Sequence, residues 1–331
     1  MGWFRSFYER IKGAPPTDMT LVQSVPAPGL TFTGATIKPD ECYVELYVES
    51  LRLTKARKLA TTFNGVVYSF VSISREGDVQ AQLAAVSKPQ RLTQLDDKSL
   101  DKVITVSKQM MGPVPWRGGV FGLELGLFSV KTGNLLSPVL DYVTKVSTAA
   151  GVSFVGAVKP FLPLITAGMD LIAGQTADTA IEVGIDTDIT VTTSGVHAII
   201  DAPKGQIDTS KLSVDPADNK LLLNGKPFEY GYCVFSIRRA DQKTDYGEIP
   251  ELKARYAAFQ KAIVDNKIND AKEALTAFRL AAVASPDLIS SDARRLVAKA
   301  QQKLDDAFPA GGVSNDRKSR QEALAEIRLY G

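Results

Sequence analysis

Alternating apolar and polar residues predict β-strands along much of the chain up to residue 245. In residues 42–48 every second side chain is apolar, which is typical of an antiparallel strand with one buried and one solvated face. The intervening residues, from Tyr43 to Glu49, are therefore expected on the solvated face. Asn224 and Gly225 form a dipeptide preferred in two-residue hairpin turns, because both tolerate a positive φ. Further strands are expected at residues 65–73, 103–106, 120–130, 181–192, 196–200, 212–214, 220–223 and 230–238.

The period changes to that of a helix after Pro250. Apolar residues then recur every three or four positions through three segments, and Pro309 ends the third. Ser290 or Ser291 is the expected cap of that third helix, and residues 319–329 are expected to form a short fourth helix. The positions expected on buried helix faces are Leu252, Tyr256, Phe259, Ile263, Ile268, Ala271, Leu275, Phe278, Ala282, Leu296, Val297, Ala300 and Leu304.

The most apolar stretch, residues 137–174, lies between two β-rich regions. Between residues 146 and 169 its only charge is Lys159, and Pro160 and Pro163 follow. A central lysine costs about 3 kcal/mol in a bilayer and a proline inside a helix roughly as much again. We therefore expect a pair of buried helices here, with entry into a bilayer as the alternative.

Together these patterns predict an α+β protein. Antiparallel β-sandwich-like sheets are expected to carry the inserted apolar helical pair and a C-terminal helical bundle. The length of 331 residues suggests two or three domains. The expected divisions are an N-terminal amphipathic helix with a Pro-rich connector (1–29), a β-rich region (30–136), the helical insert (137–174), a second β-rich region packing with the first (175–247) and an α-helical module (248–331).

Composition narrows the classes of partner. A net charge of +2 gives no overall attraction for nucleic acid, which is therefore not expected as a partner. Cys42 and Cys233 lie among apolar strand residues and are expected to be reduced, buried thiols. The N-terminus has no apolar core of the kind found in secretory signals, so a cytoplasmic location is expected.

Few residues suggest catalysis. His197 is the single histidine and is expected on the surface of a strand. The sequence has no glycine-rich phosphate-binding motif and no cluster of zinc ligands, so no catalytic residue, cofactor or metal is assigned. Glu182, Asp186 and Asp188 share one face of a predicted strand and are expected to be solvated. An enzyme with an unrecognised carboxylate site is the third functional hypothesis.

Three surface features are candidate binding sites. The first is a helix face near the N-terminus, which suits docking on a protein core or attachment to an anionic membrane: Trp3, Phe4, Phe7, Tyr8 and Ile11. The second is a basic loop that would attract anions: Arg52, Lys55, Arg57 and Lys58. The third is a Gly-rich loop in which a tryptophan is either an anchor or a binding tip: Trp116 and Arg117.

The function we expect is non-catalytic. A binding or adaptor protein would use the β-sandwich body and the helical C-terminal module to bind another protein. The alternative is a membrane-associating or membrane-perturbing effector, peripheral to the bilayer, that uses the N-terminal aromatic helix and the apolar residues 146–173.

Overall fold

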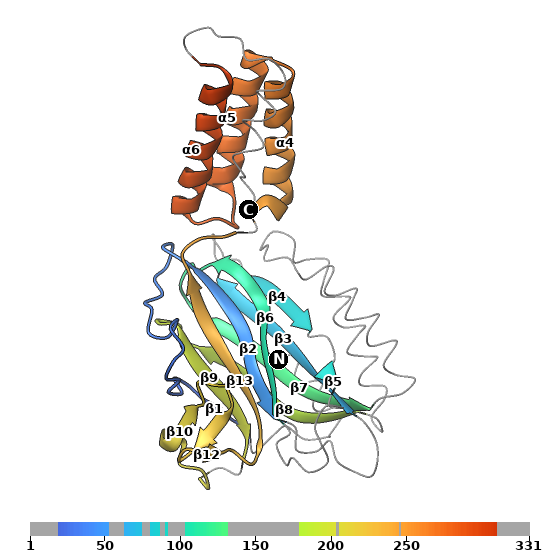
Figure 1. Ribbon diagram of the computed structural model, residues 1–331, viewed down its shortest axis with the longest axis vertical. Coiled ribbons are helices and arrows are strands. Elements are labelled where there is room, and N and C mark those ends of the chain that lie inside the picture. The colour runs from blue at the N-terminus through green and yellow to red at the C-terminus, as the bar shows by residue number, and fades with distance from the viewer. Residues whose placement is uncertain are drawn as a thin grey trace. The chain divides into compact units, whose positions relative to one another are not determined.

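The computed structural model describes residues 19–52, 63–74, 80–86, 90–91, 103–131, 179–202, 205–244 and 246–309. They form antiparallel sheets and three α-helices, so the fold is α+β as predicted (Figure 1). The predicted N-terminal helix, the insert at 137–174 and the fourth helix at 319–329 lie outside the described residues.

The chain divides into two compact units. We call the first the β unit, which comprises Met1–Lys38, Val44–Gly112 and Arg117–Arg239. We call the second the helical unit, which comprises Pro39–Tyr43, Pro113–Trp116 and Ala240–Gly331. The helical unit therefore takes in two short pieces from earlier in the chain, in addition to the C-terminal segment.

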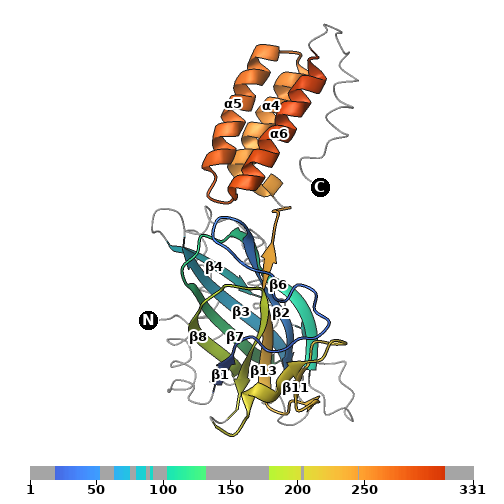
Figure 2. The same ribbon diagram turned by 90° about the vertical axis from the view of Figure 1, so that its left-hand side faces the viewer.

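The described residues of the β unit form two five-stranded sheets and a three-stranded sheet (Figures 1 and 2). The strands of the first sheet, in spatial order, are β1 (Met19–Val22), β9 (Gly195–Asp201), β13 (Gly231–Ala240), β2 (Tyr43–Arg52) and β6 (Val103–Pro115). Those of the second are β4 (Gln80–Val86), β3 (Phe63–Ser74), β7 (Phe121–Lys131) and β8 (Thr179–Ile189), with β5 (Gln90–Arg91) also pairing with β3. Those of the third are β10 (Leu212–Val214), β11 (Leu221–Leu223) and β12 (Lys226–Pro227).

Strand β6 is longer than the sequence suggests. The glycines and prolines of residues 110–119 predict a loop, but β6 continues to Pro115 and only residues 116–119 of this range lie outside a strand. The prediction is wrong for residues 110–115 because β6 is the last strand in its sheet. Proline cannot donate a hydrogen bond to a neighbouring strand, and an edge strand has a side on which none is needed.

The hairpin predicted at Asn224 and Gly225 is confirmed. These residues join β11 to β12 and have φ values of 53° and 72°. The small sheet shares a hydrophobic core with one face of the first sheet, and this core is formed by Val25, Val196, Ala198, Ile200, Ala202, Leu212, Val214, Leu221, Phe228, Tyr232 and Val234.

The prediction that Tyr43 and Glu49 lie on a solvated face of β2 is wrong. Both residues are fully buried. Alternation correctly indicates which residues share a face of a strand, but it does not indicate what covers that face. Tyr43 is covered within the helical unit, where its hydroxyl donates a hydrogen bond to Asp292.

The described part of the helical unit contains three helices that lie side by side, α4 (Pro250–Val264), α5 (Ile268–Ala284) and α6 (Ser290–Ala307) (Figures 1 and 2). The residues predicted on buried faces are buried, except that Val297 is half-buried and Ile268 is 40% exposed. Asn266 ends α4 with a φ of 59°, and the N–H groups of Asn266 and Lys267 donate to the carbonyls of Ile263 and Ala262. This pattern closes the last turn of a helix and reverses the chain toward α5.

The start of α6 is fixed by an aspartate rather than by a serine cap. The cap residue is Ile289, which makes no side-chain cap bond, so the prediction of Ser290 or Ser291 is wrong. Asp292, 2% exposed, instead accepts hydrogen bonds at Oδ2 from the Tyr43 hydroxyl and the Lys243 N–H, both at 2.8 Å. Its Oδ1 accepts two from the Arg295 guanidinium, at 2.9 and 3.1 Å. The Tyr43 hydroxyl also accepts a hydrogen bond from the Ile289 N–H.

Both cysteines behave as predicted. Cys42 and Cys233 are buried and free. Burial raises the pKa of the Cys233 thiol to about 12, so this thiol stays neutral at physiological pH. Among the described residues no helix combines the length and apolar character required to cross a membrane.

Candidate functional site

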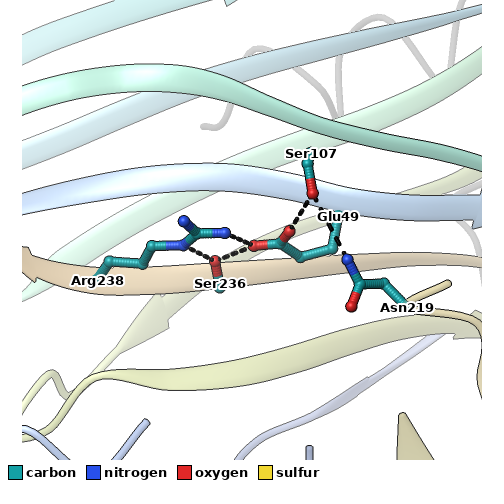
Figure 3. A network of polar contacts seen from close by, with 5 residues as sticks. All are labelled: Glu49, Ser107, Asn219, Ser236 and Arg238. Carbon is teal, nitrogen blue, oxygen red and sulfur yellow. Dashed lines mark hydrogen bonds and ion pairs between the residues drawn. The ribbon is translucent and has the colours of Figure 1, made fainter. Parts of the chain in front are cut away.

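A buried carboxylate, Glu49, lies at the centre of a polar cluster in the β unit (Figure 3). Strand β2 supplies Glu49, β6 supplies Ser107, and β13 supplies Ser236 and Arg238. Asn219 comes from the turn between β10 and β11. We call these five residues the Glu49 cluster. It joins three neighbouring strands of the first sheet to a turn of the small sheet.

Both oxygens of Glu49 accept hydrogen bonds. Oε1 accepts from Arg238 Nη2 at 2.6 Å and from the Ser236 hydroxyl, and Oε2 accepts from the Ser107 hydroxyl at 3.0 Å. Arg238 Nε also donates to Ser236 Oγ at 3.0 Å, and Asn219 Nδ2 donates to Ser107 Oγ at 3.5 Å. The Glu49 side chain is 1% exposed and that of Arg238 is 23% exposed, so one charge of the pair is fully shielded from water.

Two aromatic rings contact the Arg238 guanidinium. Its central carbon lies 4.2 Å from the centroid of the Phe32 ring and 3.9 Å from that of the Tyr47 ring. A cation is attracted to the face of an aromatic ring, and a planar guanidinium stacks on it. Burial, helped by the charge of Glu45, raises the pKa of the Tyr47 hydroxyl, so this ring stays neutral. The arginine is thus held by a carboxylate at its edge and by rings at its faces.

Neighbouring backbone bonds hold the segment that carries Phe32. The N–H of Gly34 donates to the Ser194 carbonyl at 2.8 Å, and the Ser194 N–H donates to the Ala35 carbonyl at 2.7 Å. The N–H of Arg239 donates to Ser194 Oγ at 2.9 Å. These bonds tie the backbone next to Phe32, whose ring contacts the guanidinium, to the loop at Ser194 and to the end of β13.

The geometry of the Glu49 cluster suits a structural ion pair. A general acid or base needs an oxygen within reach of a substrate, whereas the oxygens of Glu49 are buried and already bonded. A buried charge requires a partner and hydrogen bonds, and the cluster provides both.

No protein-family model, no curated protein and no solved structure matches this chain.

Of the predicted basic loop, only Arg52 lies within the described residues. It is half-buried at the end of β2, where its Nη1 donates to the Phe228 carbonyl, while its Nε is buried without a hydrogen-bond partner. Part of this guanidinium is thus bonded to the backbone of the β unit itself. Lys55, Arg57 and Lys58 lie outside the described residues, so the anion-binding patch stays a prediction.

The tryptophan of the predicted binding loop is buried. Trp116 is 2% exposed, and its N–H donates to the Cys42 carbonyl while its carbonyl accepts from the Asp40 N–H. These contacts favour the anchor over the binding tip, and Arg117 beside it is half-buried. The aromatic residues of the N-terminal candidate lie outside the described part of the chain: Trp3, Phe4, Phe7, Tyr8 and Ile11.

The three carboxylates predicted on one strand face, Glu182, Asp186 and Asp188, all belong to β8. Asp186 and Asp188 are exposed there, in agreement with a solvated face. Among the described residues no group of three or more histidine, cysteine, aspartate or glutamate side chains is arranged to hold a metal ion.

The prediction that His197 lies on the surface is wrong. It is 6% exposed, and its ring stacks on that of Phe235 with centroids 5.1 Å apart. Its Nδ1 is buried without a hydrogen-bond partner. Burial lowers the pKa of His197 to about 4, because the charged ring would lose its hydration.

Replacing this histidine should change how stability depends on pH. The folded-state pKa lies below the ordinary value of 6.5, so as the pH falls from about 7 to 4 the unfolded chain binds the proton first. Stability is then lost over this window, by up to about 3 kcal/mol. His197→Phe, which keeps the stacking, should make denaturant unfolding between pH 5 and 7 less pH-dependent. An unchanged slope would contradict the burial of a neutral ring.

The outward face of α5 carries a surface that the sequence analysis did not identify. Leu280 and Val283 are each 67% exposed and lie one helical turn apart, whereas the opposite face of α5 is buried. Leu280 and Val283 lie outside the predicted buried face of this helix, so the sequence pattern alone could have identified them as exposed apolar residues. We call the stripe of exposed residues through them the α5 face: Asn269, Lys272, Glu273, Thr276, Arg279, Leu280 and Val283.

Proposed function

We propose that this protein is a non-catalytic binding or adaptor protein, and that the helical unit binds a protein partner through the α5 face. The supporting observation is the exposure of Leu280 and Val283 at neighbouring positions. Single exposed apolar residues are common, but adjacent ones on a surface rimmed by polar residues are typical of interaction sites. Leu280 and Val283 lie next to Arg279 and Thr276, which supply such a rim.

In this proposal the β unit is a sandwich-like scaffold. Its two larger sheets would pack through the apolar faces of strands such as β2 and β7, where Val44, Leu46, Leu123 and Leu125 are at most 1% exposed. The Glu49 cluster would stiffen the first sheet.

Affinity capture with the full chain as bait, from cells that express it, tests this function. Leu280→Arg combined with Val283→Arg should reduce the recovered partner at least tenfold, because two charges would face the partner's apolar side chains. Val120→Arg is the matched control, since Val120 is also exposed (51%) but belongs to the β unit. The control should recover the partner fully.

Recovery that does not depend on Leu280 and Val283 would overturn the proposal. The same would follow if no protein bound while the intact chain sedimented with anionic liposomes. The second result would favour the membrane-associating alternative, and its test is the loss of sedimentation on Trp3→Ala with Phe7→Ala.

A further inference from the structure

We propose that Asn224 is a site of self-modification, at which the chain loses ammonia and converts this asparagine to aspartate and isoaspartate. The reaction needs no enzyme, because the backbone nitrogen of Gly225 attacks the side-chain amide of Asn224. The site belongs to the β unit and is independent of the α5 face. It lies in the turn between β11 and β12, where both reacting groups are exposed.

The attack closes a succinimide ring. The Gly225 nitrogen gives up its proton to water and bonds to the side-chain carbonyl carbon of Asn224, from which ammonia leaves. Water then opens the ring at either carbonyl carbon, which yields aspartate or isoaspartate and adds a negative charge. Water is thus the only co-reactant. Glycine suits the position after the asparagine, because it has no side chain to obstruct the ring.

Three asparagines of the described residues have a left-handed backbone, and only Asn224 is followed by an unbonded N–H. The φ values are 59° at Asn219, 53° at Asn224 and 59° at Asn266. The N–H that follows Asn219 donates to the carboxylate of Asp218 at 3.2 Å, and the N–H that follows Asn266 donates to a carbonyl of α4 at 3.0 Å. In the described part of the chain the Gly225 N–H makes no hydrogen bond, and neither does the side chain of Asn224.

The turn also leaves room for the reaction. Asn224 and Gly225 are exposed, and apart from the chain neighbours no heavy atom lies within 4 Å of the point where a Cβ of Gly225 would be. The asparagine must rotate out of the hairpin geometry to bring its side chain to the nitrogen. This rotation costs little free energy, because β12 comprises only Lys226 and Pro227, which are exposed and pair with two residues of β11.

The two products differ in their effect on the hairpin. Asp-Gly is, like Asn-Gly, a preferred dipeptide for a two-residue turn, so aspartate at position 224 leaves β11 and β12 paired. Isoaspartate carries the main chain through the side-chain carbon and so adds a methylene to the loop. Because loop length fixes the register of a hairpin, the pairing of Leu223 with Lys226 is then lost. The modification therefore loosens β11, whose Leu221 belongs to the core shared with the first sheet.

A second Asn-Gly pair in the same chain is a matched control. Asn64 and Gly65 lie inside β3 and pair with β7 on one side and with β5 on the other. A strand held on both sides can form the ring only after the sheet opens, so this pair should react far more slowly. Because the dipeptide is identical, a difference in rate between the two sites comes from the fold.

Ageing of the folded full chain at neutral pH, followed by peptide mapping with mass spectrometry, tests the proposal. Deamidation at Asn224 should be at least about tenfold faster than at Asn64, because the rate falls exponentially with the free energy needed to open the structure. In the chain unfolded in denaturant the two sites should react at similar rates. Raising the pH should accelerate the reaction at Asn224, because the attacking nitrogen must lose its proton.

Asn224→Gly is the matched variant, because Gly-Gly also suits the turn but has no side-chain amide to react. Hydrogen exchange at the β11 amides should increase as the wild type ages and stay unchanged in aged Asn224→Gly. A rate at Asn224 in the folded chain no higher than that at Asn64 overturns the proposal. The same loss of β11 protection in aged Asn224→Gly also overturns it.

Discussion

Asp292→Ala is expected to lower the free energy of unfolding of the helical unit by about 3 kcal/mol. The substitution removes the acceptor of four hydrogen bonds and leaves the buried Tyr43 hydroxyl and the Lys243 N–H without it. It also frees Arg295 from its ion pair. Denaturant unfolding, monitored by hydrogen exchange at the amides of α4, α5 and α6, measures the effect.

Asp270→Ala is the control for this prediction. Asp270 also lies in the first turn of a helix, but its side chain is 59% exposed and pairs with Lys267 at 3.5 Å. An exposed pair contributes at most about 1 kcal/mol, so its loss should change stability little. If Asp292→Ala costs no more than Asp270→Ala, Asp292 does not hold the start of α6 in place.

Glu49→Ala should destabilise the β unit by roughly 2 to 4 kcal/mol. Its loss leaves the half-buried Arg238 without a counter-charge and takes the acceptor from the Ser107 and Ser236 hydroxyls. Adding Arg238→Met should recover part of the loss, because the uncompensated charge is then gone. Equilibrium unfolding of the three variants in denaturant measures both effects.

Glu45 offers a matched comparison on the same strand. Its Oε1 accepts a hydrogen bond from Gln109 Nε2 at 2.9 Å, but this pair is exposed. Glu45→Ala should therefore cost much less than Glu49→Ala. Equal costs for the two glutamates would show that the shielded ion pair does not stabilise the sheet.

Local patterns were sufficient to predict most of the regular structure. The alternation in β2 and β7 and the period of α4 and α5 follow from which residues must be buried on one face. Segments distant in the sequence cover the other face of a strand. The alternation in β2 therefore wrongly predicts that Glu49 and Tyr43 face the solvent. The same holds for β6, where Pro113 and Pro115 are compatible with a strand only because it lies at an edge.

The Glu49 cluster could not be predicted from the sequence. Glu49 and Arg238 are 189 positions apart, and nothing near either residue indicates that β2 and β13 are neighbours in the sheet. The α5 face, in contrast, could have been predicted from the sequence. Leu280 and Val283 lie off the apolar stripe of Ala271, Leu275 and Phe278, and exposed apolar residues on an otherwise amphipathic helix are readable without coordinates.

The most direct test of the proposed function is a photo-crosslinking amino acid placed at Val283 in the full chain, in living cells, with the same group at Val120 as the control. We predict a protein adduct at position 283, and no matching adduct at position 120. The absence of any protein adduct at position 283 would contradict the assignment of the α5 face as the surface that binds a partner.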